Sequence, residues 1–136
     1  MSLSSDANAW EHLGYWFEFS ESRTTWVFRL TRAARHKLSR LFWDYVRDPR
    51  HAVLSEHDHY GPYSDLKIVT WSEPRIDGDG IWGSMGELSQ LASLIDERLL
   101  PAQVGEVIRI DREYFPSGNG AIEILVLNDD AALIPP

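Results

Sequence analysis

Three of the chain's five histidines lie in one polar stretch, residues 51–65, together with three carboxylates. His57 and His59 are two positions apart, so in an extended segment their rings point to the same side and can chelate one metal ion. A zinc site needs a third and usually a fourth ligand, and no second compact cluster of ligands supplies them. We therefore expect a solvated loop here, with no metal and no cofactor. A metal site at His57 and His59 is the alternative.

Acid–base catalysis is the other chemistry that this stretch allows, because an imidazole titrates near neutral pH. It requires partners that converge in space, and the sequence identifies none. Ser84 lies in no nucleophile-elbow pattern, and residues 78–86 lack the lysine of a phosphate loop and the glycine order of a dinucleotide turn. Cysteine is absent, which excludes a thiol nucleophile. The sequence thus indicates a protein that is not an enzyme; a small metal-dependent or His/carboxylate hydrolase using the His57/His59 loop is the alternative.

The elements that must position these residues follow from hydrophobic periodicity. Alternation of apolar and polar residues predicts strands at 15–19, 25–30, 65–71, 106–111 and 121–128, with a short strand around 81–82. Helical spacing predicts one helix that starts at Thr31 as its N-cap and stops before Pro49. A second helix begins with a capping box formed by Ser84 and Glu87 and ends near Pro101.

Two amphipathic helices each need an apolar surface to cover, and one sheet supplies it. We therefore predict an α+β fold with a single, mainly antiparallel sheet of five to six strands and both helices packed on one face. No linker divides the chain, so residues 1–136 are expected to form a single domain in which 1–13 are poorly ordered or loosely packed. No segment approaches the length of a membrane span, and the expected location is cytoplasmic.

The net charge of −8 is unevenly distributed, with +2 in residues 1–50 and −10 in residues 51–136. An acidic surface repels phosphate backbones, which disfavours binding to nucleic acid, and it attracts a basic partner. Membrane association is not expected either. Solubility alone is the other explanation for the charge.

The two faces of the predicted sheet have different compositions. Helices are expected to cover the face that carries Phe17, Phe28, Ile68, Ile108, Ile110, Ile122 and Ile124. The opposite face then exposes tryptophan and arginine, the residue types that dominate interface energetics. The candidate partner-binding residues on that face are Trp16, Glu18, Arg29, Trp71, Arg109 and Glu123. Coverage by the chain's own loops and burial in a homodimer are the alternatives.

The second half of the chain, with the segments 81–99, 105–115 and 120–128, resembles small bacterial immunity proteins of polymorphic toxin systems. The resemblance implies a cytosolic, non-enzymatic inhibitor that neutralises a cognate toxin by occlusion. The matching positions are packing positions, so no contact residue is implied. A basic toxin suits the acidic charge. A hydrolase and a homo-oligomeric structural protein are the other hypotheses.

Overall fold

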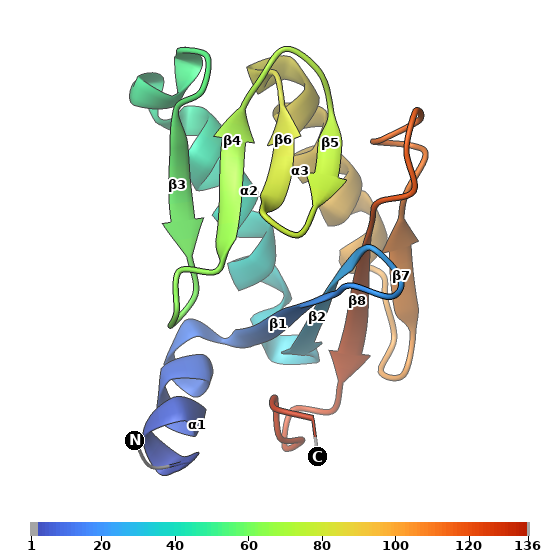
Figure 1. The fold of residues 1–136 in the computed structure, drawn as a ribbon. Coiled ribbons are helices and arrows are strands. Elements are labelled where there is room, and N and C mark those ends of the chain that lie inside the picture. The colour runs from blue at the N-terminus through green and yellow to red at the C-terminus, as the bar shows by residue number, and fades with distance from the viewer. Residues whose placement is uncertain (1–2, 136) are drawn as a thin grey trace.

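The computed structural model describes residues 3–135 and shows two four-stranded sheets with three α-helices in that range (Figure 1). The α-helices are α1 (Leu3–Leu13), α2 (Arg35–Arg47) and α3 (Met85–Leu99). The strands are β1 (Tyr15–Ser20), β2 (Thr25–Thr31), β3 (His57–Tyr60), β4 (Leu66–Thr70), β5 (Arg75–Asp77), β6 (Gly80–Gly83), β7 (Val107–Ile110) and β8 (Ala121–Leu127).

The strands form a first sheet in the order β1-β2-β8-β7 and a second sheet in the order β3-β4-β6-β5. The central pair of each sheet, β2 with β8 and β4 with β6, is parallel, and the flanking pairs are antiparallel. The α+β class was predicted, but the single sheet of five to six strands was wrong. Hydrophobic alternation identifies the buried side of a strand, and it does not identify the strand's partner.

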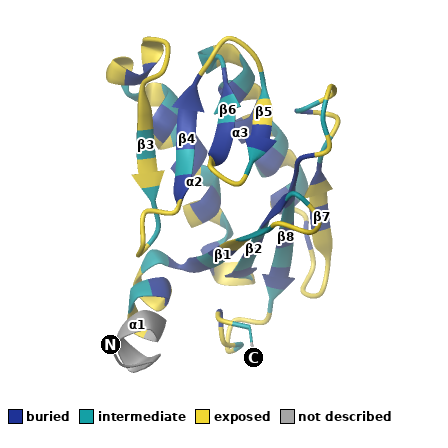
Figure 2. Cartoon of the chain, in the orientation of Figure 1, coloured by how far each residue is buried: buried dark blue, intermediate teal, exposed yellow. Residues whose placement is uncertain are grey.

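Three elements of the structure have no counterpart in the predicted list. Strands β3 and β5 are short edge strands, and Figure 2 shows β3 largely exposed beside the mostly buried β4. Helix α1 lies in the segment that was expected to be loosely packed. Its Trp10 is buried, and the Trp10 ring packs edge-on against Phe17 at 5.2 Å between centroids. Residues 1 and 2 of that segment lie outside the described range.

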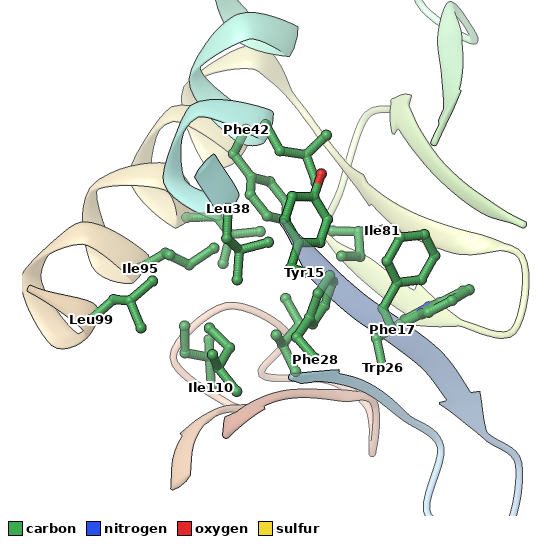
Figure 3. Close-up of a cluster of buried hydrophobic side chains, with 14 of the residues drawn as sticks. Tyr15, Phe17, Trp26, Phe28, Leu38, Phe42, Ile81, Ile95, Leu99 and Ile110 are labelled. Carbon is green, nitrogen blue, oxygen red and sulfur yellow. The ribbon is translucent and has the colours of Figure 1, made fainter. Parts of the chain in front are cut away.

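One continuous hydrophobic core joins the helices to both sheets (Figure 3). In Figure 3, Leu38 and Phe42 of α2 and Ile95 and Leu99 of α3 converge on side chains from both sheets. All seven side chains that were expected on the helix-covered face are buried: Phe17, Phe28, Ile68, Ile108, Ile110, Ile122 and Ile124. The periodicity therefore identified the core side chains correctly, although they belong to two sheets.

The structure confirms the predicted N-terminus of α3 and shows that the predicted N-cap of α2 was wrong. The Ser84 hydroxyl accepts from the Glu87 amide at 3.1 Å, and the Glu87 carboxylate accepts from the Ser84 amide at 2.9 Å, so the capping box is confirmed. Thr31 does not cap α2: it precedes a 3₁₀ turn, Arg32–Ala34, and its side chain makes no capping bond. The Asp129 carboxylate instead accepts from the Ala33 amide at 2.9 Å. A residue far along the chain thus supplies a cap that a local pattern does not reveal.

The two sheets meet through specific contacts between side chains and backbone. The Trp26 indole donates to the Asp77 carbonyl at 2.7 Å, and the Tyr114 hydroxyl donates to the Trp82 carbonyl at 2.6 Å. Gly120, just before β8, lies so close to β5 that a Cβ atom there would be 2.4 Å from the Ile76 carbonyl oxygen. These contacts join β2 and the segment between β7 and β8 to strands β5 and β6 of the second sheet.

Candidate functional site

The six candidate partner-binding residues are divided between the two sheets. Trp16 pairs with Arg29, and Arg109 pairs with Glu123 across the first sheet. These four residues and Glu18 alternate with the buried core residues, so they share the sheet face opposite the core, here called the outer face of the first sheet. Trp71 follows β4 in the second sheet. The structure therefore brings five of the six residues to one face and separates Trp71 from them.

Glu123 lies between two arginines on this face. One of its carboxylate oxygens accepts from Arg109 at 2.6 Å, and the other forms an ion pair with Arg23. Arg109 also contacts Asp111 at 3.2 Å. The Arg112 backbone amide donates to the Asp111 carboxylate at 2.6 Å, and this hydrogen bond is the largest cause that lowers the pKa of Asp111 below its ordinary value. Charges on this side of the face are therefore balanced within the protein.

The C-terminal segment occupies the Arg29 end of the outer face. Arg29 donates from Nε to the Leu133 carbonyl at 2.8 Å and from Nη2 to the Ala132 carbonyl at 3.4 Å. Leu133 is buried, and Trp16 is half-buried with its ring 6.3 Å from that of Trp10. The chain's own segments thus engage Arg29 and Trp16. Glu18 remains exposed.

Glu18 lines an acidic cleft where the two sheets meet. The cleft has a volume of about 330 Å³ and contains side chains from the β1–β2 hairpin and from the turns before β4 and β6. Three exposed acidic residues and three aromatic residues are among those that line it. The lining residues are Phe17, Glu18, Phe19, Glu21, Trp26, Asp65 and Gly78. We call this site the acidic cleft.

The composition of the acidic cleft suits a positively charged side chain. No basic residue is among those that line it, so the charged groups of its lining are all negative. An entering guanidinium or ammonium group would gain charge-assisted hydrogen bonds from Glu18, Glu21 or Asp65. The aromatic rings add the attraction of a cation for a π face. Sequence reasoning missed Glu21 and Asp65 because only the packing of the two sheets brings them together.

Trp71 belongs to a separate aromatic cluster on the second sheet. Its ring meets the Trp82 ring edge-on at 5.8 Å, and the Arg75 guanidinium lies 5.0 Å from the Trp82 ring centroid. Arg75 also pairs with Asp77 at 2.6 Å. Trp71 is 37% exposed, so its position gives a partly open aromatic surface rather than an extension of the acidic cleft.

The histidine-rich stretch is not a solvated loop throughout. His51 is buried in a 3₁₀ turn, Pro49–Ala52, whereas His57 and His59 are exposed on β3. His51 contacts the Tyr45 carbonyl through Nδ1 at 2.7 Å and Asp58 through Nε2 at 2.9 Å. Among the described residues, no three histidine, cysteine or carboxylate side chains form a group that could hold a metal.

Tyr45 links this turn to β4. Its hydroxyl donates to the Glu56 carbonyl at 3.0 Å and lies 2.8 Å from the Thr70 hydroxyl. Burial raises the pKa of Tyr45, while the hydrogen bond with Thr70 acts in the opposite direction. The Thr70 hydroxyl donates to the His51 carbonyl at 2.5 Å. These bonds hold a polar cluster against the core, and they account for His51 as a structural residue.

No protein-family model, curated protein or solved structure matches this chain at a significant level. The resemblance to immunity proteins therefore stays a prediction. Among residues 3–135, none of the helices combines the length and the apolar character needed to cross a membrane.

Proposed function

We propose that this chain is a non-enzymatic, acidic binding protein whose acidic cleft receives a basic side chain of a protein partner. The observation that carries the proposal is the composition of the cleft: three exposed acidic residues and three aromatic residues line it, with no base among the lining residues. With the resemblance of the second half to immunity proteins, the proposed biological role is an inhibitor that neutralises a basic toxin by occlusion.

Long-range charge supports the same proposal. The net charge of −8 attracts a basic protein from a distance and raises the association rate at low salt. Exposed carboxylates elsewhere on the surface affect mainly the association rate. A basic side chain enclosed in the cleft instead slows dissociation. The proposal therefore predicts separate effects for charge in the cleft and charge elsewhere.

The test uses the protein encoded beside this gene as the partner, with its toxicity and its binding to this chain measured in parallel. A cleft variant, Glu18→Gln/Glu21→Gln/Asp65→Asn, is compared with Glu97→Gln/Glu106→Gln/Asp130→Asn. The two variants lose the same formal charge at exposed positions. The cleft variant is expected to weaken binding at least about 10-fold, mainly through faster dissociation. The control variant is expected to slow association only.

Two results would overturn the proposal. One is the absence of binding at low salt. The other is an equal loss of affinity in both triple variants, because net charge alone would then explain the interaction. A stable homodimer that buries the cleft, seen by sedimentation and abolished in the cleft variant, would replace the proposal with self-association.

A further inference from the structure

His57 and His59 form a pair of exposed imidazoles on one side of the edge strand β3. Their ring centroids are 5.2 Å apart, and the ring planes are inclined by 77°. Two-residue spacing in a strand directs both side chains to the same side, away from Asp58. Neither ring contributes to the acidic cleft, so this pair is independent of the function proposed above.

Backbone carbonyls select the tautomer of both rings. His57 Nδ1 lies 3.1 Å from the Ser55 carbonyl oxygen, and His59 Nδ1 lies 3.2 Å from the Ser64 carbonyl oxygen. A carbonyl oxygen only accepts hydrogen bonds, so Nδ1 carries the proton in each neutral ring. The lone pair is then on Nε2, and this is the arrangement by which proteins orient a metal-binding histidine.

The spacing of the rings suits a shared ion. With a metal–nitrogen bond of about 2.0–2.1 Å, two adjacent imidazoles on one ion have ring centroids roughly 4.5–5 Å apart, the smaller value in a tetragonal Cu²⁺ site and the larger at a tetrahedral angle. The observed 5.2 Å agrees with that spacing. We propose that His57 and His59 form a two-imidazole site for a borderline transition-metal ion. Cu²⁺ is bound more tightly than Ni²⁺ or Zn²⁺, in the usual order for nitrogen ligands.

The surroundings limit the strength and the selectivity of this site. Asp58, between the two histidines, is paired with His51 on the other side of the strand. Lys67 is the cross-strand partner of His59, so its ammonium opposes a bound cation. Within the described residues, no third side chain joins the pair in a metal-binding group, and water completes the coordination. Hard cations such as Mg²⁺ and Ca²⁺ prefer oxygen ligands and are not bound here.

The experiment is a Cu²⁺ titration of the metal-stripped protein by calorimetry near pH 7.5, with Mg²⁺ as the negative control. We expect one Cu²⁺ per chain that binds more tightly than an ion held by a single exposed histidine. His57→Ala or His59→Ala turns a chelate into a single ligand and weakens binding at least about 10-fold, given that loss of even an outer partner costs about 10–100-fold. Lys67→Gln is expected to strengthen binding by removing the opposing charge. His36→Ala removes an exposed imidazole from α2 and serves as the matched control.

These measurements distinguish Cu²⁺ chelated by His57 and His59 from Cu²⁺ bound weakly at separate surface histidines. Unchanged Cu²⁺ affinity in the His57→Ala/His59→Ala variant would overturn the proposal, and so would an equal loss in His36→Ala. Electron paramagnetic resonance of the Cu²⁺ complex provides a second readout: two coupled nitrogens are expected in the wild-type protein and one in either single variant. Both histidines are exposed, and circular dichroism checks that each variant retains its fold.

Discussion

The imidazole of His51 lies flat on the ring of Tyr45, with centroids 3.8 Å apart and ring planes inclined by 6°. His51 is 3% exposed, and its two nitrogens face the Tyr45 carbonyl and the Asp58 carboxylate. Both of these oxygens accept hydrogen bonds. Each ring nitrogen therefore has an oxygen acceptor within hydrogen-bond distance, while the face of the ring packs on Tyr45.

Removal of this ring is expected to destabilise the fold. His51→Ala leaves a cavity against Tyr45 and removes one of the two hydrogen-bond partners of the Tyr45 carbonyl, so the free energy of unfolding should fall by about 2–4 kcal/mol. Chemical denaturation at pH 7 measures the change. His57→Ala, at an exposed position, should stay within about 0.5 kcal/mol of the wild type. Equal stability of the two variants would show that His51 has no structural role.

Gly120 tests the junction between the two sheets. Gly120→Ala would place a Cβ atom 2.4 Å from the Ile76 carbonyl oxygen, and backbone on both sides must then move. We expect a loss of about 1–3 kcal/mol in the free energy of unfolding. Gly86→Ala is the control, because the space around Gly86 is open and alanine should stabilise helix α3 by about 0.4–1 kcal/mol. Effects of the same sign and size would argue against a close approach at Gly120.

The capping box gives a prediction for the start of α3. Ser84→Ala removes the acceptor for the Glu87 amide and should cost about 1 kcal/mol of stability. Ser93→Ala, in an exposed part of the same helix, should change stability by less than about 0.5 kcal/mol. Thermal melts of the two variants beside the wild type measure the difference. A melting temperature for Ser84→Ala that equals that of Ser93→Ala would contradict the cap.

Buried phenols predict a loss of stability at alkaline pH. Burial raises the pKa of Tyr15, Tyr60 and Tyr114 above the ordinary value of 10.0. Each raised pKa contributes stability that is complete below pH 10 and declines as the pH rises further, because the unfolded chain ionises first. The decline amounts to about 1.4 kcal/mol per pH unit for each such tyrosine.

Tyr15→Phe isolates one of these groups, since Tyr15 is 3% exposed and lies among aromatic rings. The variant and the wild type should differ little at pH 7, and above pH 10 the wild type should lose stability faster, so that the variant becomes the more stable of the two. Urea denaturation at pH 7, 9, 10 and 11 gives the comparison. Parallel stability curves through pH 11 would show that the Tyr15 phenol ionises equally in the folded and unfolded chains.

Much of the core was predictable because it depends on local alternation. The periods in residues 15–19 and 121–128 identified inward side chains such as Phe17 and Ile124, and both are buried. The Ser84–Glu87 spacing identified a helix start because both partners lie within one turn. The short strands β3 and β5 were missed because four or fewer residues with few apolar side chains give no clear period.

The amino-acid sequence by itself determined the α+β class, the inward face of each long strand, the capped start of α3 and the acidic charge. The tertiary structure alone decided that β8 pairs with β2 and β6 with β4 in separate sheets, and that Glu18, Glu21 and Asp65 share one cleft. The physical reason is the distance along the chain over which each effect acts. Periodicity and capping act between residues a few positions apart, whereas strand partners and the cleft depend on how the helices and both sheets together bury a common core.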